Sequence, residues 1–117
     1  MATLALIYKI CHKKEWTQAV HEHIYAGSAR DREDRFIHFS AAEQVPGTLV
    51  RYYSQAGDLV LVAVDPATLG HALRYEPSRD GALFPHLYGT LPLSFVKWVR
   101  PIRRQPDGGF AIPKECV

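Results

Sequence analysis

The chain of 117 residues is long enough for one domain with its own core and too short for two. Hydrophobic residues make up 47% and charged residues 22%, a balance typical of globular proteins that excludes a disordered or fibrous chain. The formal net charge of +2 includes no Lys/Arg run of the kind that binds nucleic acid non-specifically, so nucleic acid is a disfavoured partner.

The beginning of the chain predicts a cytoplasmic protein without a membrane partner. Residues 4–10 form a short β-branched and aromatic run, which we interpret as a first strand because no basic flank of a signal peptide precedes it. No apolar stretch approaches the roughly 18 residues that span a bilayer. The cysteines, Cys11 and Cys116, lie near opposite ends without a closely spaced framework, which favours two free thiols in a reducing cytosol.

A helix is predicted over residues 13–25, where apolar side chains recur at helical spacing and Trp16 is the expected core anchor. The segment from Gly27 to Arg35 alternates in charge and has almost no apolar content. It predicts a solvated turn, with a mobile flap beside a site as the alternative. Residues 36–39 then predict a buried strand.

A second helix is expected after this strand. Ser40 and Glu43 have the spacing of a capping box, in which the hydroxyl and the carboxylate each accept from the other residue's backbone N–H. Pro46 suits the first position of a helix because proline has no N–H to leave unpaired. We therefore expect a helix from Pro46 to about Gln55.

The second half of the chain predicts mainly strands. Residues 59–64 are six consecutive apolar residues, which indicates a strand buried on both faces, and Asp65 is placed to cap a short turn after it. Further strands are expected over 73–76, 95–102 and 110–112, with a loop over 77–85 and a hairpin turn over 106–109. The order predicts a single α+β domain over 1–117, with two helices and a largely antiparallel sheet.

A histidine in the apolar 36–39 strand is the first candidate catalytic residue. Because a buried imidazole needs a partner for each nitrogen, His38 is either a core histidine bonded to a backbone carbonyl or a histidine that points into a cleft. The alternation of a strand places Ser40 on the same face as His38. The two side chains could therefore belong to one site.

The segment from Phe84 to Gly89 carries the second candidate. It is predicted as a loop held by proline and glycine, and if it is extended His86 and Tyr88 point the same way. Glu76 ends a predicted strand and is either an exposed edge charge or a group that orients a histidine or acts as a general base. Gln44 has no structural explanation from its spacing.

Other common sites are absent from the sequence. No HExxH motif or other ligand spacing occurs, and His21 and His23 point to different sides of the predicted helix, so no metal site is predicted. The chain also lacks a Walker loop and a GxGxxG motif. A basic cluster formed by Lys97, Arg100, Arg103 and Arg104 predicts a solvated strand face, with binding of an anionic ligand as the alternative.

Several segments, in their order, resemble the bacterial family of domain of unknown function 952. These segments are Ile-Tyr-Lys-Ile with Trp16 soon after, Phe-Ile-His-Phe-Ser followed by Glu43-Gln44-Val45, the apolar strand followed by Asp65, Leu-Arg-Tyr-Glu at 73–76, and Phe-Pro-His-Leu-Tyr-Gly at 84–89. The resemblance covers about residues 4–102 and leaves a hairpin and tail over 103–117. It implies a fold similar to that of ADP-ribosyltransferases, with split small sheets and a central cleft that holds NAD in active relatives.

The resemblance also implies roles for individual residues. Tyr8 and Lys9 on the first strand would meet phosphate or ribose. His38 and Ser40 would supply the polar ring and the hydroxyl of the second strand. The third place, usually a glutamate that stabilises positive charge on the ribose, falls to Glu76 or to the segment with His86 and Tyr88. With Gln44 these residues form the expected site.

The leading hypothesis is an ADP-ribosyltransferase-like protein that binds NAD or a related nucleotide as substrate, without a resident cofactor, and transfers or removes ADP-ribose. The first alternative is a small-ligand or protein-binding module without enzyme activity, in which the histidines are structural. The second alternative is binding of phosphate or RNA ends through Lys9 and the cluster from Arg100 to Arg104. The sequence predicts no particular oligomeric state.

Overall fold

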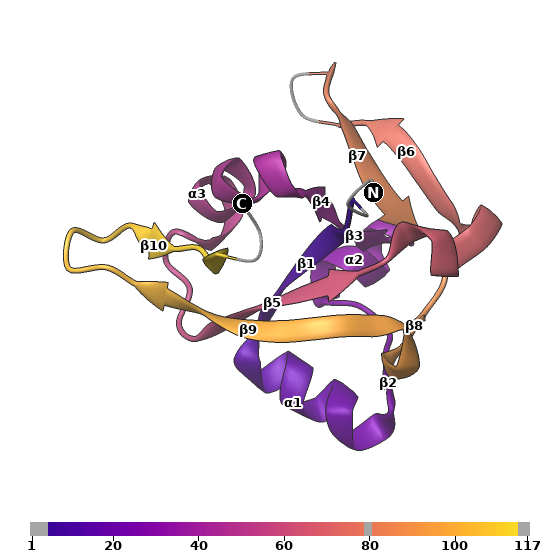
Figure 1. Cartoon of the computed structure of the whole chain (residues 1–117), viewed down its shortest axis with the longest axis horizontal. Coiled ribbons are helices and arrows are strands. Elements are labelled where there is room, and N and C mark those ends of the chain that lie inside the picture. The colour runs from indigo at the N-terminus through magenta and orange to yellow at the C-terminus, as the bar shows by residue number, and fades with distance from the viewer. Residues whose placement is uncertain (1–4, 79–80, 115–117) are drawn as a thin grey trace.

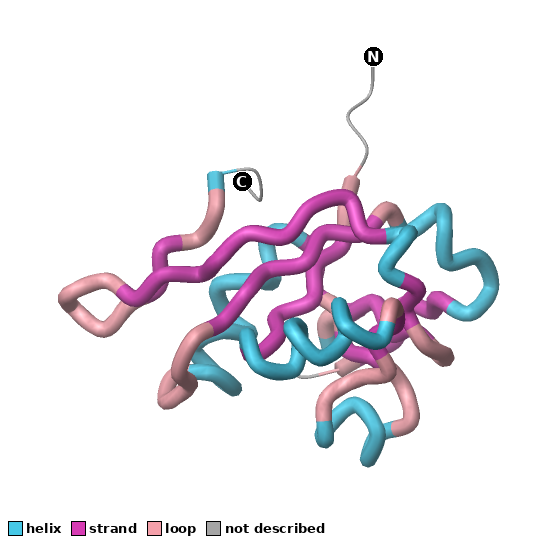
Figure 2. The backbone as a smooth tube through the Cα atoms, turned by 90° about the horizontal axis from the view of Figure 1, so that it is seen from below, coloured by secondary structure: helices cyan, strands magenta, loops and turns pink. Residues whose placement is uncertain are grey.

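A five-stranded antiparallel sheet forms the centre of the computed structural model, which describes residues 5–78 and 81–114 (Figure 1). Its strand order is β10-β9-β5-β1-β4. The strands are β1 (Ile7–His12), β4 (Ser40–Ala41), β5 (Leu59–Val64), β9 (Val96–Arg104) and β10 (Phe110–Ala111). The hairpin of β9 and β10 projects from the rest of the molecule in both views (Figures 1 and 2).

Two smaller antiparallel sheets accompany the central one. The order β3-β7-β6 joins β3 (Ile37–His38), β7 (Leu83–Leu87) and β6 (Leu73–Pro77), while β2 (Ile24–Tyr25) pairs with β8 (Leu91–Pro92). The α-helices are α1 (Lys13–Glu22), α2 (Ala29–Asp34) and α3 (Val45–Tyr53). This confirms the predicted α+β fold with antiparallel sheets. None of the helices in the described residues is long and apolar enough to cross a membrane.

The predicted strand over 59–64 is confirmed, and it separates two cores. Alternate residues of β5 point to opposite faces, and all six are buried. Val60, Val62 and Val64 pack with Trp16 of α1 on one face. The other three residues pack with Val45 and Leu49 of α3 in a second cluster, so the helices cover both faces of the sheet. Cys11 lies in the first core as a free thiol, whereas Cys116 lies outside the described residues.

The helix predicted over 13–25 is three residues shorter in the structure. His23 takes a left-handed conformation with φ of 64°, and its N–H donates to the carbonyls of Ala19 and Val20. This is a common way to end an α-helix, although glycine is its usual residue. Ile24 then begins β2. The prediction was therefore right about the helix and wrong about its last turn.

The solvated loop predicted from Gly27 to Arg35 is wrong, because the structure has helix α2 there. The Ser28 hydroxyl accepts from the Asp31 N–H at 3.2 Å, and the Asp31 carboxylate accepts from the Ser28 N–H at 2.9 Å. These bonds form a capping box that starts the helix. Arg35 ends it in a left-handed conformation. A six-residue helix is marginal by itself, so its tertiary contacts must hold it in place.

The strand predicted over 36–39 is shorter in the structure, and a second strand in another sheet follows it after Phe39. Ile37 and His38 pair with β7, whereas Ser40 and Ala41 pair with β1 of the central sheet. Between them the Phe39 N–H donates to the Pro85 carbonyl at 2.9 Å. This short segment therefore connects the central sheet to the β3-β7-β6 sheet.

The capping box predicted for Ser40 and Glu43 is also wrong. The Ser40 hydroxyl instead lies 3.1 Å from the Thr48 hydroxyl. Gln44 takes the capping role, since its Oε1 accepts from the Ala41 N–H at 2.9 Å and its Nε2 donates to the Leu83 carbonyl at 2.8 Å. Helix α3 then runs over Val45–Tyr53, close to the predicted second helix.

The loop predicted over 77–85 ends earlier than expected. Residues Leu83–Leu87 form strand β7, so most of the segment from Phe84 to Gly89 is strand rather than loop. Residues 79–80 of the predicted loop lie outside the described residues. The cap at Asp65, strands near 73–76 and 95–102, and the hairpin after Arg104 are confirmed. The turn of that hairpin places Gly108 at φ of 88°, a conformation that favours glycine.

Candidate functional site

The two candidate histidines meet across one strand pair. His38 on β3 and His86 on β7 are register partners, and their ring centroids lie 5.7 Å apart. Residues 48 positions apart in the chain are therefore brought to the same face of the small sheet. The structure therefore brings the two imidazoles close enough to belong to one site.

A small, partly enclosed cavity of about 30 Å³ lies against both imidazoles. This volume is room for about two water molecules. Its polar lining includes two cations, three aliphatic hydroxyls and the two imidazoles: Lys9, Arg30, Ser40, Thr48, Ser78, His38 and His86. Tyr52, Tyr53 and Phe84 add aromatic surface. The cavity contains no carboxylate among these lining residues, which makes it suited to an anionic or polyhydroxylated group.

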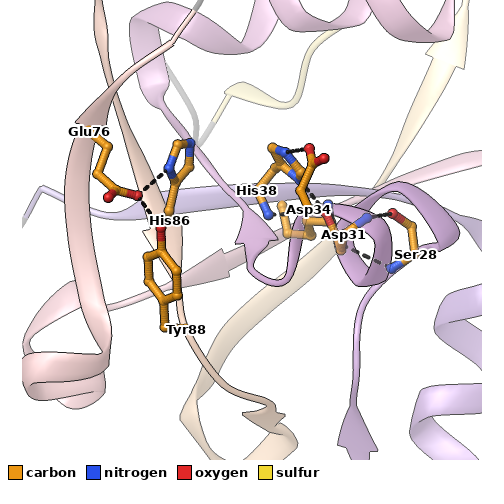
Figure 3. Close-up of polar contacts among 8 residues, drawn as sticks. Ser28, Asp31, Asp34, His38, Glu76, His86 and Tyr88 are labelled. Atoms are coloured by element: carbon orange, nitrogen blue, oxygen red, sulfur yellow. Dashed lines mark hydrogen bonds and ion pairs between the residues drawn. The ribbon is translucent and has the colours of Figure 1, made fainter.

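Asp31 organises the buried side of this cavity. Its side chain is only 2% exposed and lies 2.9 Å from the Lys9 ammonium, which is itself buried. The same carboxylate accepts from the His38 backbone N–H at 3.1 Å and lies 2.5 Å from His38 Nδ1 (Figure 3). Together with the bond from Ser28, these contacts attach α2 to both β1 and β3.

The ionised form of Asp31 is strongly favoured. Burial by itself would raise the pKa of this carboxyl, but the hydrogen bond from His38 and the charge of Lys9 outweigh it and hold the pKa well below its ordinary value of 3.8. The Lys9 charge is thereby compensated inside the protein. A ligand in the cavity consequently meets a neutralised Lys9–Asp31 pair rather than an available lysine.

His38 is held by carboxylates on both ring nitrogens. Nδ1 faces Asp31, and Nε2 lies 2.9 Å from the carboxylate of Asp34, which is on the exposed side of α2 (Figure 3). Only an imidazolium can donate to both carboxylates at once. This arrangement fixes the ring and leaves neither nitrogen free for proton transfer to a ligand.

His86 has a different environment. Its Nδ1 lies 2.8 Å from Oε1 of Glu76 on the neighbouring strand β6, and the Tyr88 hydroxyl donates to the same oxygen at 2.7 Å (Figure 3). These two bonds lower the pKa of Glu76, and the bond to Glu76 raises the pKa of Tyr88. If Nδ1 carries the proton, the other nitrogen of His86 has a lone pair available to a ligand.

Phe36 connects the two histidines. Its ring stacks on His86 with a centroid distance of 4.0 Å and is tilted against His38 at 4.6 Å. It also contacts Tyr88 at 5.3 Å. The phenyl ring therefore limits the rotation of both imidazoles, and an apolar contact of this kind is worth about 1 kcal/mol beyond its buried area.

The comparisons with known proteins identify the family. The family described as protein of unknown function (DUF952) matches residues 10–99. The chain belongs to this family. No curated protein matches it.

The DUF952 chain is also similar to a solved bacterial structure. The crystal structure of protein CC0527 from Caulobacter crescentus has 41% sequence identity and a TM-score of 0.87, and the match covers 95% of this chain and 97% of that one. The solution NMR structure of CC0527 has 44% identity and a TM-score of 0.79, covering 89% and 90% of the two chains. The family resemblance noted in the sequence is confirmed.

The residues predicted for the site are divided by the structure into two groups. Four of them line the cavity, namely Lys9, His38, Ser40 and His86. Glu76 and Tyr88 lie behind His86 and contact it or its partner instead. Tyr8 is buried in the second core, where its ring lies 5.7 Å from that of Trp98, and Gln44 has the capping role described above.

The sequence analysis missed several residues of the candidate site, among them Arg30, Asp31 and Thr48. Asp31 and Arg30 lie in the segment predicted as a loop, and Thr48 lies on α3. The Ser28-x-x-Asp31 spacing is typical of a capping box, and it could have predicted that Arg30 and Asp31 lie in the first turn of a helix. Thr48 carried no such signal.

In the described residues no group of three or more His, Cys, Asp or Glu side chains could hold a metal ion.

The basic cluster on β9 is separate from this cavity. Arg100 and Arg103 line a different groove together with Lys13, whereas Lys9 lines the histidine cavity. Arg104 donates to the carbonyls of Tyr53, Ser54 and Ala56 at 3.3, 2.5 and 3.0 Å. Arg104 therefore ties the end of α3 to the β9–β10 hairpin, and Lys9 and the arginines do not form one anion-binding surface.

Proposed function

We propose that this DUF952 protein binds a nucleotide-type ligand at the histidine cavity, with NAD as the first candidate. The observation that carries the proposal is the lining of one small cavity by Arg30, His86 and the hydroxyls of Ser40 and Thr48. Guanidinium, imidazole and hydroxyl groups are suitable partners for phosphate and ribose oxygens. The ADP-ribosyltransferase-like fold that we expected from the family resemblance is the reason to test NAD before other nucleotides.

Arg30 is the cation best placed to meet a phosphate. Its guanidinium lies 3.9 Å from the centroid of the Tyr52 ring, and in the described part of the chain no carboxylate lies within ion-pair distance of it. Because stacking uses the face of the guanidinium, the N–H groups on its edge stay available for an anion. Lys9, in contrast, is already paired with Asp31.

The size of the cavity restricts how such a ligand binds. An enclosed space of about 30 Å³ admits a phosphate oxygen or a ribose hydroxyl but not a whole nucleotide. Most of the ligand would therefore lie at the cavity mouth, near Arg30 and Tyr52. A ligand held in this way is oriented by one buried group and several exposed contacts.

In a reaction, His86 would be the proton-transferring group. Glu76 accepts from Nδ1–H and would keep the other nitrogen as a base, in the way that carboxylates orient catalytic histidines. Glu76 does not line the cavity, so we assign it to positioning His86 and not to stabilising charge on a ribose. Transfer or hydrolysis of ADP-ribose would then depend on His86 activating the acceptor hydroxyl or water.

NMR titration tests the proposal. We expect NAD or ADP-ribose at millimolar concentration to shift the His86 imidazole signals and the Ser40 amide. Arg30→Gln should weaken the response about tenfold or more, since a charge-assisted hydrogen bond contributes about 1.5–3 kcal/mol. Arg103→Gln, which removes an exposed arginine from the separate groove, is the matched control. If NAD, ADP-ribose and nicotinamide all leave these signals unmoved, the proposal is wrong.

The alternative function, a binding module without enzyme activity, is supported by the contacts of His38. His38 is engaged by Asp31 and Asp34, so this histidine has the contacts of a structural residue. A binding module would show the NMR response of the wild type without releasing nicotinamide from NAD. Measurement of nicotinamide release by the wild type and by His86→Gln separates the two functions. Binding of RNA ends would instead show a steep dependence on salt.

A further inference from the structure

A second, outer hollow adjoins the cavity at His86. This outer hollow has a volume of about 520 Å³ and shares Arg30, Tyr52 and Tyr53 with the inner cavity. Its other lining residues come from the end of β1 and the start of α1 and α2, and they include His12, Lys14 and Glu15. Arg30 and its stacking partner Tyr52 therefore stand at the junction of two hollows.

The charges of the two hollows are not balanced by their own side chains. Arg30 is half-buried, and neither Arg30 nor Lys14 has an ion pair with a carboxylate in residues 5–78 and 81–114. Glu15 is the carboxylate among the residues that line the outer hollow. A half-buried guanidinium with available donors at a junction is a site for an anion. An anion at this place would have room on both sides.

We propose that Arg30 binds an internal phosphate of an elongated ligand, whose two ends lie in the inner cavity and in the outer hollow. This inference rests on the proposed function of the inner cavity. The inner end would reach His86 and Ser40, where only a small polar group fits. The outer end, with more space beside Lys14 and the exposed His12 ring, would take the larger group.

The chemical class that follows is a phosphodiester or pyrophosphate with a substituent on each side. A mononucleotide has a terminal phosphate, so it could place its phosphate at Arg30 and fill one hollow only. In a dinucleotide or a nucleoside diphosphate sugar, one nucleoside would lie in the outer hollow and a hydroxyl of the second sugar would enter the inner cavity. Tyr53, which lines both hollows, is held by the bond from its hydroxyl to the Ile10 carbonyl. The shared wall is therefore already in place for a ligand that contacts both hollows.

The test compares ADP-ribose with AMP by NMR on the whole protein. We expect ADP-ribose to shift the imidazole signals of His86 and His12 together with one dissociation constant. AMP should shift signals in one hollow and bind at least about tenfold more weakly, the effect of losing one charge-assisted contact and its neighbours. Lys14→Gln should weaken ADP-ribose and AMP alike, several-fold, because the nucleoside of each would lie in the outer hollow beside Lys14, and Lys97→Gln on β9 is the control.

The outcomes separate the two proposals. If ADP-ribose shifts His86 but not His12, and Lys14→Gln has no effect, the elongated ligand is wrong while nucleotide binding in the inner cavity stands. If neither ligand shifts any of these signals, both proposals are wrong. Arg30→Lys keeps the charge without the guanidinium fork, so it should retain the fold and still weaken ADP-ribose if Arg30 binds the internal phosphate.

Discussion

The two histidines of the candidate site occupy neighbouring strands and differ in the number of carboxylates that they contact. His38 faces a carboxylate with each ring nitrogen, and one of these carboxylates, Asp31, is buried with Lys9. His86 faces one carboxylate, Glu76, which is partly exposed. The same residue type therefore has both ring nitrogens occupied at one position and, in our proposal, would have one nitrogen available to a ligand at the other. What decides between these roles is the number of ring nitrogens that the protein itself occupies.

The largest effect should come from breaking the buried network under His38. Asp31→Asn leaves the buried Lys9 ammonium without its counter-charge, and removal of one partner of a buried ion pair costs about 3–5 kcal/mol. Urea unfolding monitored by tryptophan fluorescence measures the loss. We expect the variant to be close to unfolded at 37 °C, since small domains have only about 5–15 kcal/mol of stability.

Asp34→Asn is the control for this substitution. It also removes a carboxylate from His38, but the Asp34 side chain is 42% exposed. Exposed pairs contribute about 1 kcal/mol or less. Equal losses from Asp31→Asn and Asp34→Asn would show that burial does not distinguish the two carboxylates, and the structural role of the network would then be wrong.

The pH dependence of stability should follow from the same residue. The pKa of Asp31 is lower in the folded protein than its ordinary value of 3.8, so the folded state binds the Asp31 proton less readily than the unfolded state does. The stabilisation by Asp31 is therefore complete above about pH 5 and is lost as the pH falls toward the folded pKa. The free energy of unfolding of the wild type should decrease below pH 5. The decrease should be smaller in Asp31→Asn, and an equal decrease would contradict the assignment.

A paired substitution tests the comparison of the histidines directly. His38→Gln should lower the free energy of unfolding by about 1–3 kcal/mol, because it removes hydrogen bonds to two carboxylates. His86→Gln should cost about 1 kcal/mol, mainly from the stacking on Phe36, because water can solvate Glu76. Nucleotide binding should show the reverse order. If His38→Gln reduces binding more than His86→Gln at equal folded fraction, the assignment of roles is wrong.

The sequence predicted the fold where apolar periodicity was strong. The strand over 59–64 and the helix beginning at residue 13 are examples, since their side chains alone indicate which face is buried. Helix α2 could not be predicted from periodicity, because its segment from Ala29 to Asp34 is almost entirely charged. Its stability depends on contacts of Asp31 with Lys9 and His38, which are distant in sequence.

The candidate site was also predictable only in the residues whose local sequence was unusual. The apolar neighbours of His38 and the placement of His86 beside Pro85 indicated polar groups in unusual surroundings, and the two residues do meet. Their partners were not predictable, because Glu76 contacts His86 only through the pairing of β6 with β7. Gln44 had no explanation in the sequence because its second partner, the Leu83 carbonyl, is 39 residues away.

The smallest effect on stability should come from the carboxylate behind His86, and it is the most specific test of the comparison. Glu76→Leu removes the acceptor of Nδ1–H, whereas glutamine would keep an amide oxygen that can accept, so in Glu76→Leu the proton of the neutral His86 ring should move to the other ring nitrogen. Long-range proton–nitrogen spectra of the imidazole measure the tautomer. We expect an Nδ1–H form in the wild type, an Nε2–H form in Glu76→Leu and little change in the free energy of unfolding, since Glu76 is partly exposed. Tyr88→Phe is the control, because it removes the other bond to the same oxygen and should leave the tautomer unchanged. An unchanged tautomer in Glu76→Leu would mean that Glu76 does not orient His86, and the proposed base would lose its positioning group.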